Sequence, residues 1–106
     1  MPDKLWKATE RRIAKIIGDG AQRNSLSGMN AKITAGDIIH DKFYVEVKER
    51  AKIPFYKVFQ DVKINAKKEH KIPIMVIHQK NSKDDILIMT LKDFKALNDG
   101  GMHDEE

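Results

Sequence analysis

Three residues near the middle of the chain have types and a spacing that suit a divalent cation and a phosphate. Glu46 and Lys48 lie two residues apart in a segment predicted as a β-strand, so their side chains share one face. Asp37 lies nine residues before Glu46, on the strand expected beside it. Two carboxylates opposed across a sheet repel each other, and a hard cation such as Mg²⁺ offsets that repulsion. The three residues therefore predict a metal-assisted hydrolytic site.

The residues around this pair of carboxylates complete the chemistry. The peptide carbonyl of Val47 offers a further oxygen ligand, and Mg²⁺ leaves its remaining positions to waters and substrate phosphates. Lys48 is placed to orient an attacking water or to offset charge in the transition state. The arrangement suits hydrolysis of a phosphodiester with Mg²⁺, or with Mn²⁺ as its substitute, and it calls for no nucleotide cofactor.

Glu10 stands out because it interrupts an apolar helical stripe. Residues 3–18 are predicted as a helix in which Trp6, Ile13 and Ile17 recur at helical spacing, and Glu10 lies in the same stripe. A carboxylate on an inward face is costly unless something satisfies it. Two interpretations are open. Glu10 is either a hydrogen-bonded glutamate at the edge of the core, or a third carboxylate of the site that binds the metal or a metal-bound water.

The remaining elements must position these side chains. In chain order we expect a long Gly-, Ser- and Asn-rich loop over residues 19–35, two strands joined by a tight turn over 36–48, a helix over 54–70, a buried strand over 74–77, a strand over 85–90 and a short helix over 91–98. The order α-β-β-α-β-β-α predicts a small single-domain α/β fold, with a central mixed β-sheet flanked by helices.

Alternation and helical spacing indicate which side chains face inward. A two-residue turn at 41–42 pairs His40 with Phe43 across the first two strands. The same register places Asp37 opposite Glu46. One face of the second strand is formed by Phe43, Val45 and Val47. The side chains expected to pack inward from the helices are Trp6, Phe55, Val58, Phe59, Val62, Leu91, Phe94 and Leu97.

Composition allows a polyanionic partner and excludes several kinds of site. The 106 residues contain 20 Lys and Arg against 16 Asp and Glu, a formal charge of +4. Four of those acids lie in residues 99–106, predicted as a flexible acidic tail, so the body of the chain carries +8. The absence of cysteine excludes disulfides and thiolate metal sites. No apolar run is long enough to span a bilayer and no signal peptide is recognisable, which predicts an intracellular, cytoplasmic protein without membrane contact.

Gly36-Asp37 followed by Glu46-Val47-Lys48 resembles the PD-(D/E)XK nuclease signature, with glycine in place of the leading proline. The resemblance covers most of the chain and narrows to the archaeal-type Holliday junction resolvases, which also occur in viruses. Those proteins share a glutamate in the first helix, a loop with arginine and small hydroxyl residues, a basic helix and an Ile-Pro apolar strand. The matching residues here are Glu10, then Arg23, Ser25, Ser27 and Gly28, and then Ile72 to Ile77.

This resemblance implies a homodimeric, Mg²⁺-dependent endonuclease that cuts four-way DNA junctions. It also implies a restriction-endonuclease-like fold over residues 1–98. The catalytic residues would be Glu10, Asp37, Glu46 and Lys48, and the metal ligands Glu10, Asp37, Glu46 and Val47. The expected DNA contacts are Arg11, Arg12, Arg23, Ser25, Ser27, Arg50, Lys63, Lys67, Lys68, His78 and Lys80, with Gln60 and Tyr44 as supporting residues of the site.

Some residues depart from the pattern of these resolvases. Glu49 follows the lysine where serine or threonine is frequent, and His78 ends the apolar strand where a basic residue is frequent. The chain is also shorter at its C-terminus. Two alternatives stay open: another nuclease of the superfamily, of the restriction, repair or packaging type, and a nucleic-acid-binding module without catalysis.

Overall fold

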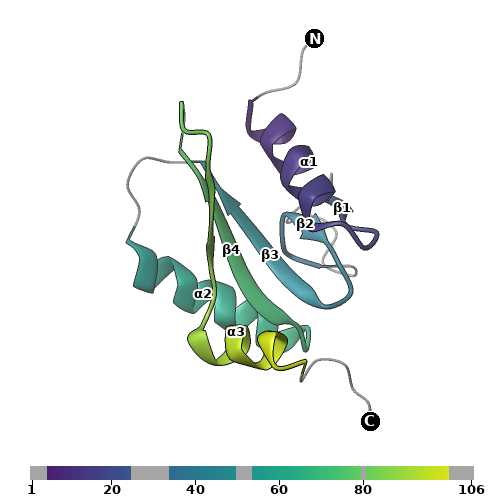
Figure 1. The fold of residues 1–106 in the computed structure, drawn as a ribbon, viewed down its shortest axis with the longest axis vertical. Coiled ribbons are helices and arrows are strands. Elements are labelled where there is room, and N and C mark those ends of the chain that lie inside the picture. The colour runs from purple at the N-terminus through teal and green to yellow at the C-terminus, as the bar shows by residue number, and fades with distance from the viewer. Residues whose placement is uncertain (1–4, 25–33, 50–53, 80, 101–106) are drawn as a thin grey trace.

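Five strands form one mixed sheet in the order β1-β2-β3-β4-β5, and three helices accompany it (Figure 1). The computed structural model describes residues 5–24, 34–49, 54–79 and 81–100. Within them the elements are α1 (Leu5–Ile17), β1 (Gln22–Arg23), β2 (Ile38–Ile39), β3 (Phe43–Lys48), α2 (Phe55–Lys68), β4 (Ile72–His78), β5 (Asp85–Ile88) and α3 (Leu91–Asn98). The predicted small α/β fold with a central mixed sheet is confirmed.

The predicted register between the first two strands is also confirmed. Ile38 of β2 pairs antiparallel with Val45 of β3, which is the register that places His40 opposite Phe43. His40 stabilises the tight turn because its Nδ1 accepts hydrogen bonds from the backbone N–H groups of Lys42 (3.0 Å) and Phe43 (3.2 Å). Local turn chemistry and alternation were sufficient to position Asp37 beside β3.

The prediction of one uninterrupted loop over 19–35 is wrong at residues 22–23. These residues form β1, which pairs antiparallel with β2 through Gln22↔Ile39 and Arg23↔Ile38. A strand of two residues has no periodicity to recognise, so only its partner reveals it. Asn24 secures the pairing, because its backbone N–H donates to the Asp37 carbonyl oxygen at 2.8 Å. Residues 25–33 lie outside the described residues.

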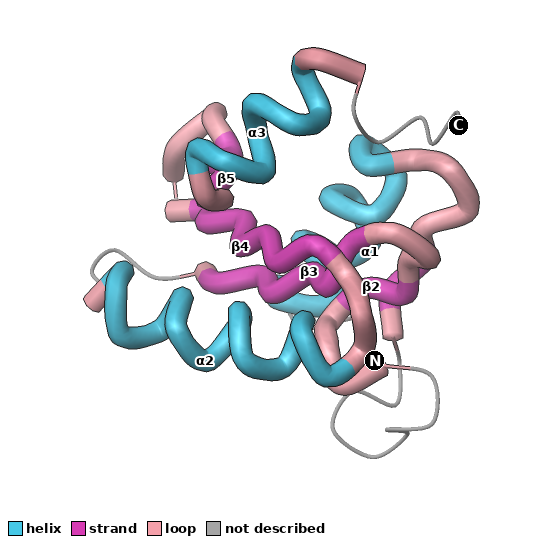
Figure 2. The backbone as a smooth tube through the Cα atoms, turned by 90° about the horizontal axis from the view of Figure 1, so that it is seen from below, coloured by secondary structure: helices cyan, strands magenta, loops and turns pink. Residues whose placement is uncertain are grey.

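Two apolar layers lie on opposite faces of the sheet. β3 and β4 run parallel, as the crossover through α2 requires, and each buries side chains on both faces. The layer on the α1 side contains Ile13, Ala14, Ile38, Val45, Ile74 and Val76, and the layer on the α2 side contains Tyr44, Phe59, Val62, Ala66, Met75 and Ile77. Figure 2 shows α2 lying along its face of β3 and β4. The helix that carries Glu10 therefore covers the face opposite to α2.

The prediction that α3 turns its apolar side chains into the core is wrong. No side chain of α3 is buried, and Leu91 and Phe94 are 81% and 52% exposed. The helix follows the edge strand β5 and projects beyond it at one end of the molecule (Figure 1). Its start is stabilised locally, because Thr90 Oγ1 accepts a hydrogen bond from the Asp93 backbone N–H at 3.1 Å. Phe55 at the start of α2 is likewise half exposed, against the prediction.

None of the helices in the described ranges is both long and apolar enough to cross a membrane.

Candidate active site

Asp37 is fixed against β3 at the point where β2 begins. Its backbone N–H donates to the Val45 carbonyl oxygen at 2.8 Å. Its side-chain Oδ2 accepts a hydrogen bond from the Val47 backbone N–H, also at 2.8 Å. The carboxylate is thus held at the middle residue of Glu46-Val47-Lys48, as the predicted pairing of Asp37 with this tripeptide requires.

Glu46 and Lys48 lie on one face of β3, and their side chains form an ion pair. Lys48 Nζ lies 3.2 Å from Glu46 Oε2, and both side chains are partly exposed. Burial raises the pKa of Glu46, the charge of Asp37 raises it further, and Lys48 lowers it. The carboxylates of Asp37 and Glu46 therefore interact as predicted, and the ammonium group of Lys48 offsets part of their negative charge.

Glu10 reaches the same region from α1. It is 6% exposed, and its Oε1 accepts a 2.9 Å hydrogen bond from Arg23 Nε of β1. Burial and the charge of Asp37 raise the pKa of Glu10 to about 7, against the opposing effect of Arg23, and Glu46 adds a smaller increase. Glu10 is thus a hydrogen-bonded glutamate, as the first interpretation states, and it is affected by the charges of both other carboxylates. Its binding of a metal or a metal-bound water stays a prediction.

This raised pKa predicts a pH dependence of stability. Between pH 4.5 and about 7, the folded chain holds the Glu10 proton more tightly than the unfolded chain does, so the free energy of unfolding falls as the pH rises through that window. The Glu10→Gln variant should lose this contribution, on the order of 2 kcal/mol between pH 5 and 8. Urea unfolding of both proteins in EDTA measures it. Equal pH slopes for the two proteins would show that Glu10 titrates normally.

Gly36 allows the close approach that positions Asp37. A Cβ atom at residue 36 would lie 2.9 Å from the Val45 carbonyl oxygen, and the Gly36 N–H donates to Thr34 Oγ1 at 3.1 Å. The glycine thus has a physical role at the position where the resembling signature has proline, because proline would remove that N–H donor.

We expect the Gly36→Ala variant to be less stable by about 1–3 kcal/mol, because its new methyl group meets backbone rather than a movable side chain. Denaturant unfolding measures the loss. Ala35→Ser, at the exposed neighbouring residue, is the control and should change stability by less than about 0.5 kcal/mol. A Gly36→Ala variant as stable as the control would contradict the steric role.

The chemistry of the carboxylates fits a cation that two of them would hold. Burial and mutual repulsion disfavour three negative charges at this place without a compensating positive charge. Over the described ranges, no group of three or more His, Asp or Glu side chains is arranged so that it could hold a metal ion as it stands. Arg23 occupies one oxygen of Glu10. Asp37 and Glu46 would be the one or two carboxylates that Mg²⁺ commonly uses.

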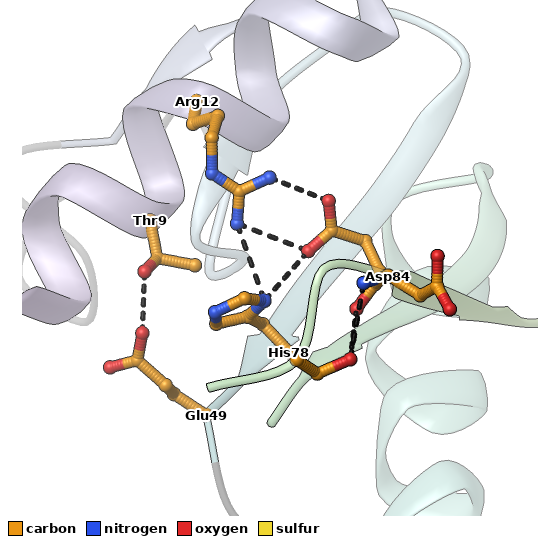
Figure 3. A network of polar contacts seen from close by, with 7 residues as sticks. Thr9, Arg12, Glu49, His78 and Asp84 are labelled. Carbon is orange, nitrogen blue, oxygen red and sulfur yellow. Dashed lines mark hydrogen bonds and ion pairs between the residues drawn. The ribbon is translucent and has the colours of Figure 1, made fainter. Parts of the chain in front are cut away.

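A second polar cluster joins α1 to the ends of β3, β4 and β5 (Figure 3). Arg12 forms a bidentate ion pair with Asp85 at 2.5 and 3.0 Å, and His78 Nδ1 lies 3.0 Å from the same carboxylate. The hydrogen bond from Arg12 is the main reason that the pKa of Asp85 is lowered. Beside it, the Thr9 hydroxyl donates to Glu49 Oε2 at 2.5 Å. Sequence reasoning missed Asp85, because 73 residues separate it from Arg12.

This cluster changes the role of two predicted DNA contacts. Arg12 and His78 both contact Asp85, so they connect α1 to β4 and β5. Glu49 is held separately, by the Thr9 hydroxyl of α1. His78 and Glu49 thus each have a partner within the chain, Asp85 and Thr9 respectively.

The structure does not bring every predicted residue to the site. Gln60 and the lysines predicted on α2 are exposed residues of the helix that packs on the Tyr44 face of the sheet, and their side chains point to solvent. Tyr44 is buried under α2 on the face of β3 that carries Glu46, so it lies near the site without being open to solvent. Burial, then the charge of Glu46, raise its pKa to about 12. The lysines of α2 that were predicted to contact DNA are Lys63, Lys67 and Lys68. The predicted DNA contacts Ser25, Ser27, Arg50 and Lys80 lie outside the described residues.

No family model, curated protein or solved structure matches the chain. Its function is therefore inferred from the arrangement of its own residues.

Proposed function

We propose that this chain is a metal-dependent DNA endonuclease of the PD-(D/E)XK type, with four-way junctions as its substrate. One observation carries the proposal: the Asp37 carboxylate is hydrogen-bonded to the backbone of the tripeptide in which Glu46 and Lys48 pair at 3.2 Å. Glu10 is close enough to Asp37 and Glu46 for their charges to raise its pKa, so it adds a third carboxylate to the negative charge of the site. The mixed sheet between α1 and α2 supports the restriction-endonuclease-like fold that the resemblance implies.

Each residue of the site has a role in this proposal. Asp37 and Glu46, with the Val47 carbonyl, would hold Mg²⁺ or Mn²⁺, which when bound supplies positive charge to the phosphate and makes water a better nucleophile. Lys48, kept in place by Glu46, orients the attack and offsets charge that develops on the phosphate oxygens. Arg23 holds Glu10 at the side of the site, where Glu10 can accept a proton near neutral pH.

The alternatives are less well supported. A binding module without catalysis has no use for a buried glutamate whose charged form is disfavoured beside two other carboxylates. Another nuclease of the same superfamily would keep the chemistry and act on duplex or other branched DNA. Such a nuclease would differ from the proposed junction endonuclease only in the DNA that it cuts.

We also propose that the enzyme is a homodimer, so that two sites related by a two-fold axis cut symmetric strands. The support is an apolar face on one side of the edge strand β5 and its neighbouring helices that none of the described residues covers, made of Phe55, Tyr56, Ile86, Leu91 and Phe94. All five are more than half exposed, and a groove of about 580 Å³ runs between α2 and β5. Covering these side chains would bury on the order of 600 Å² per copy, somewhat below the roughly 800 Å² that each partner of a standard interface buries.

A cleavage assay tests the proposed activity. The full chain is incubated with end-labelled four-way junction, matched duplex and single-stranded DNA, each with Mg²⁺ or with EDTA. We expect paired symmetric nicks in the junction, with Mg²⁺ only. Equal cutting of the duplex would favour the other nucleases of the superfamily, and binding without Mg²⁺-dependent cutting of any substrate would favour the non-catalytic module.

A further inference from the structure

Trp6 lies at the surface beside the candidate site, although its spacing predicted a core position. It is 43% exposed and is the single tryptophan of the chain. The guanidinium of Arg23 lies 5.3 Å from the centroid of its ring, and Lys7 Nζ lies 5.5 Å from it. Both distances are within the range of cation–π attraction. The result is a partly exposed aromatic ring among cations, and not a residue of the core.

Arg23 connects this ring to the candidate site. The same side chain that lies over Trp6 donates to Glu10 at 2.9 Å. Trp6 and Glu10 are also four residues apart on α1, so they lie about one helical turn, or roughly 6 Å, from each other. A group that stacks on Trp6 therefore lies next to the carboxylates.

A basic groove starts at the same place. It has a volume of about 510 Å³, lies between α1 and β1, and is lined by Arg11, Lys15 and Arg23 among others. Lys7, Arg11 and Lys15 recur every four residues, so they follow one side of α1 over roughly 12 Å. That length spans on the order of three phosphates of one strand, which repeat every ~3.4 Å along a stacked helix and at longer intervals when the bases are unstacked. Arg23 both lines the groove and contacts the Trp6 ring. A cationic groove next to an aromatic ring is typical of single-strand binding.

We propose that Trp6 is a stacking platform for an unpaired nucleobase, and that the strand carrying this base runs along the Lys7-Arg11-Lys15 side of α1. In matched duplex both faces of each base are covered by its neighbours, so the ring has no base to stack on without unstacking the helix. At a branch point or a strand end, an unpaired base is available. Trp6 thus selects DNA with unpaired bases next to the candidate site, an inference that rests on DNA being the substrate.

Because the chain has one tryptophan, its fluorescence reports on this contact alone. The full chain in EDTA, where no cleavage occurs, is titrated with a short oligothymidine and with a matched duplex. Binding is followed in parallel by anisotropy of a label on the DNA. We expect the single strand to quench Trp6 and the duplex to leave its emission nearly unchanged. Single-strand binding without quenching would overturn the proposal.

Variants separate stacking from charge. Trp6→Leu should weaken single-strand binding about tenfold or more, with less than a twofold change for duplex, whereas Trp6→Phe should retain most of the affinity. Ile16→Ala is the control, because Ile16 is a 66% exposed apolar residue on the same helix and outside both the proposed platform and the apolar dimer face, and it should change neither affinity. Equal losses for Trp6→Leu and Ile16→Ala would contradict a specific platform. The stacking and cleavage results are independent, so quenching without Mg²⁺-dependent cutting would refute the nuclease and leave the platform intact.

Discussion

Replacing Asp37 with asparagine should abolish Mg²⁺-dependent cleavage while leaving DNA binding nearly unchanged. Asparagine keeps an oxygen that accepts the Val47 N–H, so the local structure is retained, but the negative charge beside Glu46 is lost. We expect the single-turnover rate of junction cleavage to fall at least about a hundredfold. The affinity for the junction, measured by anisotropy in EDTA, should change less than about threefold, because phosphate contacts come from cationic side chains elsewhere.

Asp41→Asn is the matched control for this experiment. Asp41 is an exposed aspartate in the turn that follows β2, and its replacement removes the same charge from the chain without touching the site. Its cleavage rate should equal that of the wild type. An Asp37→Asn variant that cuts at the wild-type rate would show that Asp37 holds no metal. A loss of binding as large as the loss of cleavage would show that it acts in substrate affinity instead.

Replacing Leu91 with glutamate should separate the proposed dimer into monomers. Leu91 is 81% exposed in the single chain, so the substitution changes the stability of the monomer little, but it places a charge within the apolar face. Burial of a full leucine side chain stabilises by about 1.5–3 kcal/mol, and a two-fold axis uses each contact twice. The dimer dissociation constant should therefore rise about a hundredfold or more. Light scattering should give twice the 12.2 kDa mass for the wild type and the single mass for the variant.

Ile16→Glu controls for the introduction of a charge in place of an exposed apolar residue. Ile16 is 66% exposed on α1, away from the α2, β5 and α3 face, and its replacement should leave the dimer intact. A wild-type chain that stays monomeric at high micromolar concentration would refute the dimer, as would a Leu91→Glu variant that still dimerises. The Asp37→Asn variant should remain dimeric, which keeps this result separate from catalysis.

Much of the candidate site follows from local patterns. The alternation of Phe43, Val45 and Val47 with polar neighbours predicts which face Glu46 and Lys48 share, and the turn at His40 predicts the register. Together they place Asp37 at the tripeptide, and the observed pairing of β2 with β3 has the same register. These features are predictable because they depend on residues within about ten positions of one another, where backbone geometry leaves few choices.

Other parts of the site depend on residues far apart in the chain. The sequence around Arg12 does not distinguish a solvent-exposed arginine from one in an ion pair. Its partner Asp85 is 73 residues away. The pairing of β1 with β2 places Arg23 between Trp6 and Glu10, and nothing in the two residues of β1 predicts a strand. Such contacts form because packing of whole elements brings the side chains together, and no short-range pattern encodes that.

The apolar spacing of α3 shows most clearly which features a local sequence pattern predicts and which it does not. Leu91 and Phe94 do form an apolar stripe on a helix over the predicted residues 91–98, so the local structure was correctly predicted. An amphipathic pattern predicts that the apolar face of a helix will be buried. It does not predict whether the residues that bury it belong to the same chain or to a partner. The sequence by itself determined the helices, the main strands and the spacing of Asp37, Glu46 and Lys48, because each depends on short-range geometry. Only the tertiary structure decided that Glu10, bound by Arg23, lies close to them, that Trp6 is exposed and that no described residue buries α3, because these depend on which layer lies over which face of the sheet.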